Sequence, residues 1–340
     1  MRKPEFDLMR TVAIVSVVLC HAVEASYPMQ EVTFKSYNQY SQLFALALFA
    51  FGRVGVPLFF MLTGYFVLTK HYEDENAIRY FYQTKLYRIY LASVAGILMI
   101  NCVNWLISGV SLRWIEIVKQ CLFITYLPGV QTWYIPVVVG SYIWIPLVAR
   151  GLRDMSSRIV VIAVVAVFIY RLLIQDVNAV LKLFEKPELI SEIDFGFVTI
   201  YGVYIISGWL LYQGVLTKVK TSTLLWVGLG SFVLVILLMF LTNYKVWYNS
   251  GLLFMCSVAL FELITRIDMN QVTVLTNISL CSFGIYWIHG MAQKVFLEYS
   301  RNIDNRITKT ILLFLSSFVV SFVLVSIYLR IGAQLRKSRE

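Results

Sequence analysis

Long apolar runs recur along the whole chain, with short polar segments between them. A helix that crosses a membrane needs about 20 mostly apolar residues, and ten runs come close to that length. We predict spans at residues 7–25, 41–69, 89–109, 132–149, 159–175, 195–213, 222–242, 246–265, 275–297 and 309–332. A transmembrane β-barrel would instead show strands of about 10 residues of alternating polarity. The pattern therefore predicts an all-α polytopic membrane protein of about ten transmembrane helices.

Three stretches depart from this simple picture. The second run is too long for one straight span, and Gly52, Gly55 and Pro57 predict a break within it. The stretch 113–131 is expected to be an interfacial or re-entrant piece. The one long polar loop, at 176–194, is acidic. Polar segments elsewhere are short, so we expect a single integral-membrane domain over residues 1–340.

Composition supports the membrane class and excludes others. The chain is 59% hydrophobic and 14% charged, whereas soluble domains are nearer 45–50% apolar and about 25% charged. Mean hydropathy is +0.74. A soluble enzyme, a disulfide scaffold and a disordered chain are therefore excluded. The net charge of +10 is expected to lie in cytoplasmic loops, so we expect no nucleic-acid partner, and five cysteines without a CxxC pair suggest no metal site.

The distribution of basic residues predicts an orientation. With the N-terminus inside, the predicted cytoplasmic segments hold 15 lysines and arginines, and the outer segments hold 11. The loop at 297–309 opposes this bias. Because basic residues favour the cytoplasmic side, we expect a multi-pass protein of the cell membrane with both termini in the cytoplasm.

The first span carries a polar stripe. Arg10 and His21 are eleven residues apart, which brings them to within about 20° of one helix face. Asp7 and Glu24 fall on the same stripe. Ionisable residues in hydrocarbon cost about 2.5–3.5 kcal/mol each, and they persist where they face the bundle interior. The stripe therefore marks a candidate site, although Arg10 snorkelling to the inner headgroups, with His21 as a hydrogen-bonded packing residue, fits the spacing as well.

Two further residues extend this candidate site. His289 lies in the ninth span at a depth similar to that of His21, so the two imidazoles are expected to face one cavity. The alternative is that His289 only bonds a neighbouring helix. Arg53 lies at the predicted break, where irregular backbone must line protein or water. It is expected either to bind an anionic ligand or to pair with Glu24 or another acid.

Polar and aromatic residues at the start of other spans have two interpretations each. Lys85 and Arg88 lie one helical turn apart at the start of span three. They are either positive-inside anchors or ligands for phosphates that enter from the cytoplasm. Trp133 opens span four, where it is a candidate ligand or a member of an interfacial aromatic belt. His71, beside an acidic run, is expected to be a solvated loop residue.

Five elements, in the expected order, resemble those of the integral-membrane acyltransferase family 3. Arg10 and His21, separated by ten residues, match its arginine–histidine signature in the first helix. Each element alone is a weak match, and the five in order are more specific. Among the other four elements, one has Thr63 in place of the usual serine before Gly64 and Tyr65, and another has lysine in place of the first arginine. They lie at Val56–Tyr65, Lys85–Arg88, Thr132–Ile135 and Ile278–His289. The resemblance covers about residues 5–290.

This resemblance implies a ten-helix enzyme without the family's optional soluble extracytoplasmic domain. Such an enzyme moves an acyl group, usually acetyl, from cytoplasmic acyl-CoA to a hydroxyl of a cell-surface carbohydrate or its lipid-linked precursor. Acyl-CoA is then a donor substrate, and no permanently bound cofactor is expected. The resemblance implies His21 as the catalytic base and Arg10 as its partner. Together with the residues singled out above, the candidate site is catalytic His21, Arg10, His289 and Tyr286; donor-binding Arg53, Lys85, Arg88, Tyr65 and Trp133; and supporting Asp7, Glu24 and Ser279.

The chemistry suits an imidazole. A thiolate leaves readily, but an attacking alcohol must lose its proton, and neutral histidine is a base near pH 7. His21 is therefore the expected base, with His289 or Tyr286 as oxyanion donors. A rival route acetylates His21 first and then delivers the acyl group outward. Both routes, and both acetyl and succinyl donors, fit the sequence.

Two other classes of protein fit part of the pattern. A secondary transporter or exporter of a polar or anionic solute would carry intramembrane charges and a broken span, but no internal repeat is evident. A membrane sensor that binds an acyl-CoA or a cell-wall precursor would not turn it over. For an enzyme, loops 26–40 and 176–194 are expected to shape the acceptor side, with aromatic residues available to stack on a sugar: Tyr27, Phe34, Tyr37 and Tyr40.

Overall fold

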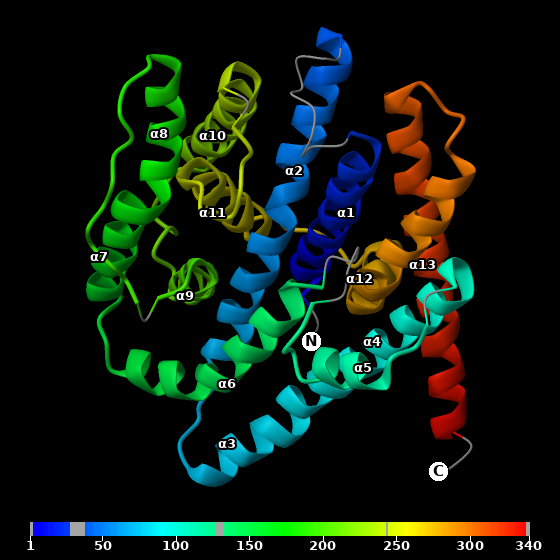
Figure 1. Cartoon of the computed structure of the whole chain (residues 1–340). Helices are drawn as coiled ribbons and strands as arrows, with labels where there is room; N and C mark the ends of the chain where they lie inside the picture. Colours follow the sequence, from blue (N-terminus) through cyan, green and yellow to red (C-terminus); the bar gives the residue numbers. More distant parts are fainter. Residues whose placement is uncertain are drawn as a thin grey trace. The chain divides into compact units, whose positions relative to one another are not determined.

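The computed structural model describes residues 3–27, 38–109, 111–126, 132–196, 198–242 and 244–337. Within these residues the protein is helical and contains no β-strand (Figure 1). Three short π-helical turns, η2–η4, interrupt the α-helices. The elements are α1 Pro4–Ser26, α2 Gln39–Thr63, η2 Gly64–Leu68, α3 Glu75–Phe81, η3 Tyr82–Leu86, α4 Tyr87–Ser108, α5 Trp114–Cys121, α6 Tyr134–Arg153, α7 Ser157–Val167, η4 Phe168–Leu173, α8 Ile174–Leu183, α9 Ile200–Tyr212, α10 Thr221–Thr242, α11 Gly251–Thr265, α12 Thr273–Tyr299 and α13 Arg306–Lys337.

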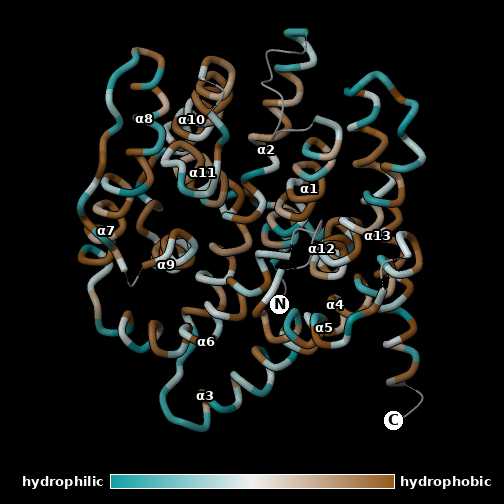
Figure 2. Tube along the Cα trace, viewed as in Figure 1, coloured by the Kyte–Doolittle hydropathy of each residue, from teal (hydrophilic) through white to brown (hydrophobic). Residues whose placement is uncertain are grey.

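Each of the ten predicted spans coincides with a helical segment. Seven helical segments of the described chain are long and apolar enough to cross a membrane, and α9 and α11 are shorter apolar helices. Figure 2 shows hydrophobic residues along α7, α9 and α10, and hydrophilic residues around α3 and in the loop after α8. The predicted class, an all-α polytopic membrane protein, is confirmed.

The chain forms two compact units. The first comprises residues 1–65 and 157–340, and the second comprises residues 66–156. In the first unit, α1 packs against α2, α11, α12 and α13, while α2 also packs against α9, α10 and α11. A buried apolar cluster joins α1, α12 and α13 through Ile14, Val18, Cys281, Ile285 and Val325. The polar stripe of α1 therefore lies within a packed bundle.

The predicted break at residues 52–57 is wrong, because α2 is helical from Gln39 to Thr63 with Pro57 inside it. Gly52 and Gly55 instead allow α1 and α2 to pack closely. A Cβ atom on Gly52 would lie 2.5 Å from the Cβ of Cys20, and one on Gly55 would lie 2.4 Å from the carbonyl oxygen of Ala13. Small residues let two membrane helices approach closely, so α1 and α2 meet backbone to backbone.

The predicted acidic loop begins too early. The helical segment that starts at Ser157 runs through α7, η4 and α8 to Leu183, so Asp176 is a buried helix residue. Its carboxylate accepts hydrogen bonds from the Ser250 hydroxyl at 2.7 Å and the Leu252 amide at 2.8 Å. Asp176 thus satisfies the amino end of α11, where free N–H groups attract an anion.

The second unit also starts its long helical segment earlier than predicted. Asp74 caps α3, where its carboxylate accepts a hydrogen bond from the Ala77 amide at 2.7 Å. The helix then continues through η3 into α4, so Lys85 and Arg88 lie well inside this segment and not at its start. The stretch 113–131 contains α5, while residues 127–131 lie outside the described residues. His71 is an exposed loop residue, as expected.

We expect Gly55→Ala to lower the free energy of unfolding by about 1–3 kcal/mol, because the added methyl group must push α1 and α2 apart. Unfolding in mixed detergent micelles measures this change. Gly230→Ala is the matched control, since nothing lies within 4 Å of a Cβ atom there; it should leave the protein equally stable or more stable. Equal effects of the two substitutions would contradict close packing at Gly55.

Candidate functional site

The centre of the candidate site is an imidazole hydrogen-bonded to a carboxylate. The His21 Nδ1 atom lies 2.7 Å from Glu24 Oε2, three residues later on the same helix. The His21 side chain is 14% exposed. A carboxylate only accepts hydrogen bonds, so Nδ1 carries the hydrogen atom, and in the neutral ring the lone pair is then at Nε2.

A buried guanidinium holds the other oxygen of this carboxylate. Arg53 of α2, with its side chain 3% exposed, pairs with Glu24 Oε1 at 2.7 Å. It also donates to the Tyr248 hydroxyl at 3.3 Å. Its charge lies over the rings of Phe49, at 4.5 Å, and Trp247, at 4.2 Å. Of the two roles expected for Arg53, the structure contains the pair with Glu24.

The loop before α11 contributes residues that the sequence analysis missed. Trp247 and Tyr248 cover Arg53, and the Tyr248 carbonyl accepts a hydrogen bond from the Tyr204 hydroxyl at 3.0 Å. Lys245, outside the spanning helices, interacts electrostatically with Glu24 and Arg53. Burial lowers the pKa of the Lys245 ammonium, Glu24 opposes that shift and Arg53 adds to it. The dense run of aromatic residues around Lys245 was the available signal in the sequence.

The second buried histidine lies beside the first. The rings of His21 and His289 are 5.4 Å apart between centroids, with planes inclined by 20°. His289 is 3% exposed, and its Nδ1 atom lies 3.0 Å from the Ile285 carbonyl oxygen on the preceding turn. The Tyr286 ring lies 6.0 Å from that of His289. The two imidazoles, expected to face one cavity from the first and ninth spans, are therefore neighbours in the structure.

The inner part of the stripe also faces α12. The buried carboxylate of Asp7 accepts hydrogen bonds from Ser279, at 2.9 Å, and from Thr276, at 3.0 Å. Arg10, with its side chain 30% exposed, lies 3.8 Å from Asp7 and donates to the Phe6 carbonyl at 3.2 Å. Because Asp7 and His21 both meet α12, with increasing residue numbers on both helices, α1 and α12 run parallel.

Tyr65 lies at the start of η2 in an aromatic cluster. Its ring packs against Phe6 at 4.9 Å, Tyr212 at 5.2 Å and Phe261 at 5.7 Å between centroids. This cluster packs the amino-terminal end of α1 against the carboxyl-terminal ends of α2, α9 and α11. Tyr65 is therefore placed near Asp7 and Arg10 along the chain of α1, and not beside His21.

Three predicted site residues belong to the second unit. Lys85 and Arg88 are exposed on η3 and α4, and the Trp133 ring contacts Tyr134 edge-on at 6.1 Å. Lys70, which precedes α3 and lies outside the spanning helices, has a pKa lowered by its partial burial and by the charge of Lys85. The second unit thus gathers at least two lysines near one another.

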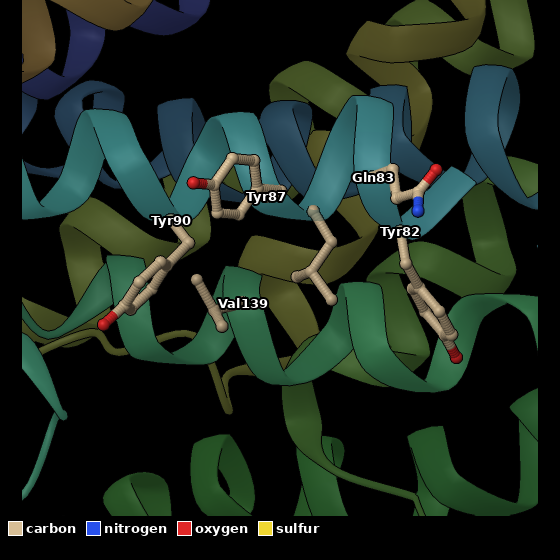
Figure 3. A pocket seen from close by; sticks show the side chains of 6 residues that line it. Tyr82, Gln83, Tyr87, Tyr90 and Val139 are labelled. Atoms are coloured by element: carbon tan, nitrogen blue, oxygen red, sulfur yellow. The ribbon is translucent and has the colours of Figure 1, made fainter. Parts of the chain in front are cut away.

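A groove of about 690 Å³ lies between η3–α4 and α6 in this unit. Figure 3 shows Tyr90 and Val139 facing each other across it, and Tyr82 donates a hydrogen bond to the Ile143 carbonyl at 2.8 Å. The lining residues are aromatic or aliphatic except for one glutamine: Tyr82, Gln83, Leu86, Tyr87, Tyr90 and Val139. Helical periodicity turns Arg88 away from this face.

The aromatic residues that were expected to stack on a sugar acceptor differ in their exposure. Tyr27 is 1% exposed and bonds the Ser41 hydroxyl at 2.7 Å, so it is a packing residue that joins α1 to α2 and is not available to a sugar. Tyr40 is 85% exposed. Phe34 and Tyr37 lie outside the described residues.

The comparisons with known proteins agree with this geometry. The chain matches the model of the family described as an acyltransferase domain, acyltransferase family 3, over residues 3–330. No curated protein and no solved structure matches the chain. The match spans nearly the whole chain, so the protein belongs to acyltransferase family 3. It is a membrane acyltransferase.

We expect Glu24→Leu to destabilise the protein by about 3 kcal/mol or more, because it leaves the buried Arg53 guanidinium without its counter-charge. Arg53→Met should cost less, since the Glu24 side chain is 21% exposed and keeps its bond to His21. The double variant should lose less than the sum of the two single losses. Unfolding in one detergent system measures all three, and strictly additive losses would contradict the ion pair.

Proposed function

We propose that this membrane acyltransferase moves an acetyl or similar short acyl group from cytoplasmic acyl-CoA to a hydroxyl of an extracytoplasmic carbohydrate or its lipid-linked precursor. The observation that carries the proposal is the His21–Glu24–Arg53 chain of contacts, at 2.7 Å and 2.7 Å, in a chain of this family. Under this proposal the protein lies in the cell membrane with both termini in the cytoplasm.

The proposed step uses His21 as a general base. The hydroxyl of the acceptor gives its proton to His21 Nε2 while its oxygen attacks the thioester carbonyl carbon. An ester C–O bond forms and the C–S bond breaks. The proton then passes from His21 to the departing CoA thiolate, so that the imidazole returns to its neutral form. Glu24 holds the ring and stabilises the imidazolium, as the carboxylate does in other acid–base–nucleophile arrangements.

Arg53 acts on this step through Glu24. A carboxylate in a low-dielectric interior would otherwise take up a proton and lose its hold on His21. The guanidinium over the rings of Phe49 and Trp247 keeps Glu24 ionised. Arg53 is therefore a positioning residue in this proposal, and its side chain is occupied by Glu24 and Tyr248 rather than offered to phosphates.

Within the second unit, Lys85 and Arg88 are proposed to bind the phosphates of the donor, and Trp133 its apolar parts. Exposure of Lys85 and Arg88 and the nearby charge of Lys70 support this role. Lysine offers a point charge, whereas arginine binds phosphate with two parallel hydrogen bonds. Arg88 is therefore the stronger expected phosphate ligand of the pair.

We expect His21→Ala to abolish acyl transfer while expression and membrane insertion persist. Mass spectrometry of surface glycans, from cells with the wild-type gene, the variant or no gene, measures the acetyl groups. Normal acetylation by the variant would overturn the proposal. An acetyl-histidine adduct, trapped on the wild type with acyl-CoA and no acceptor, would replace direct transfer by the two-step route.

We expect Arg88→Ala to raise the KM for acyl-CoA by about tenfold, which corresponds to one lost charge-assisted hydrogen bond. Lys85→Ala should raise it less, and the KM for the acceptor should stay constant in both. Steady-state transfer rates in proteoliposomes supply these constants. Lys186→Ala, an exposed lysine of the first unit, is the control, and an equal effect there would leave Arg88 without a specific role.

A further inference from the structure

The loop between α10 and α11 lies at the end of the first unit where Glu24 and Arg53 meet. Its Trp247 ring lies 4.2 Å from the Arg53 guanidinium, and its Tyr248 hydroxyl accepts a hydrogen bond from Arg53 at 3.3 Å. Glu24, the ion-pair partner of Arg53, is in the last turn of α1, which ends at Ser26. Under the orientation proposed above, α1 begins in the cytoplasm, so this loop faces the extracytoplasmic side.

Lys245 brings to this loop a positive charge that has no counter-charge. Among the described residues, the charged groups that act on its ammonium are Glu24 and Arg53. Both oxygens of Glu24 are already occupied, one by His21 and one by Arg53, at 2.7 Å each. No acid of the described residues forms a salt bridge with Lys245. Because Glu24 and Arg53 cancel, one positive charge is left over beside them.

The acidic loop after α8 does not supply the missing counter-charge. It contains four carboxylates, but none of them is among the described groups that act on the Lys245 ammonium. These residues are Glu185, Glu188, Glu192 and Asp194. The sequence of residues 28–37 holds one glutamate and one lysine, so that segment has no net charge to offer either.

Other cations at this end of α1 are accounted for by the helix itself. Arg306, at the start of α13, donates a hydrogen bond to the Ser26 carbonyl oxygen at 3.2 Å. The carboxyl-terminal end of a helix has unpaired carbonyl groups and attracts a cation. Arg306 therefore has a structural partner, whereas Lys245 has none among the described residues, and its charge remains to be explained.

Lys245 and Trp247 are both open to solvent. The Trp247 side chain is 49% exposed although it covers Arg53, and Lys245, two residues earlier, is partly exposed. Partial burial lowers the pKa of the Lys245 ammonium; Glu24 opposes that shift and Arg53 adds to it. A bound anion would stabilise the charged form of this lysine. The pair thus offers an aromatic surface and a cation next to the carboxylate that bonds His21.

We propose that Lys245 and Trp247 bind the acceptor, and that the acceptor is an anionic sugar unit whose carboxylate or phosphate group pairs with Lys245. The exposed indole offers a flat apolar surface to a sugar ring, and the ammonium donates charge-assisted hydrogen bonds to the anion. A neutral sugar would leave Lys245 without a partner. This inference rests on the proposed function, because it names the class of acceptor that would meet the base His21.

Binding without acyl-CoA is the first test. The probes are p-nitrophenyl β-D-glucoside, the corresponding glucuronide and the corresponding glucoside 6-phosphate, which share one ring and one aglycone. Isothermal titration calorimetry in nanodiscs of zwitterionic lipid avoids sugar-based detergents. We expect at least one anionic probe to bind about fivefold more tightly than the glucoside, and about 0.5 M NaCl to reduce this preference. The two anionic probes distinguish carboxylate from phosphate. A glucoside bound as tightly as both of them would overturn the inference.

Matched variants assign the preference to one side chain. Lys245→Gln should erase it and Lys245→Arg should keep it. Lys186→Gln, at an exposed lysine of the acidic loop, is the control and should behave as the wild type. Trp247→Phe keeps a ring over Arg53 and should weaken the binding of all three probes alike, so that their ratio stays constant. An anion preference that survives Lys245→Gln would overturn the inference.

Acetyl transfer to the same probes separates this inference from the proposed function. We expect Lys245→Gln to raise the KM for the preferred anionic probe about fivefold and to leave the KM for acetyl-CoA unchanged. Transfer to the glucoside with the same KM as to both anionic probes would overturn the inference and leave the proposed function standing. Lys245-dependent binding of an anionic probe that is never acetylated would support the binding site and count against the proposed function.

Discussion

The carboxylate of Glu24, which contacts both an imidazole and a guanidinium, is the interaction on which the polar interior of this structure depends. Glu24 lies 2.7 Å from His21 and 2.7 Å from Arg53, and three groups that are each costly to bury become a nearly neutral set. None of the three would persist alone at this depth, because an unpaired ion in hydrocarbon loses its solvation. The set therefore needs α1 and α2 in one register, which the close backbone approach at Gly52 and Gly55 supplies.

Helix α12 completes the arrangement by running parallel to α1. Its serine and threonine hydroxyls satisfy Asp7 at one end, and His289 packs against His21 further along. Gln293 adds a hydrogen bond to the Val18 carbonyl at 3.0 Å. The His21 imidazole is thus held by its own helix and by contacts with α2, through Glu24, and with α12.

Helical periodicity and hydropathy were enough to predict the helical segments and the stripe on α1, because these follow from geometry within one helix or from the length of an apolar run. They could not decide whether Arg53 pairs with Glu24, since that depends on the register between α1 and α2. They also missed Trp247 and Tyr248, whose loop reaches Arg53 only through tertiary folding. The predicted break failed because glycine and proline were taken as helix breakers, whereas tight interhelical packing tolerates both.

Pro57 affects the backbone of α2 at Arg53, the residue that pairs with Glu24. Proline has no N–H group, so the carbonyl oxygen of Arg53, four residues earlier, lacks its partner in the hydrogen-bond ladder of α2. The backbone of α2 is therefore softest at the turn that carries the guanidinium. Any flexing of this helix in the bilayer concentrates there, and it reaches the imidazole through the carboxylate between them.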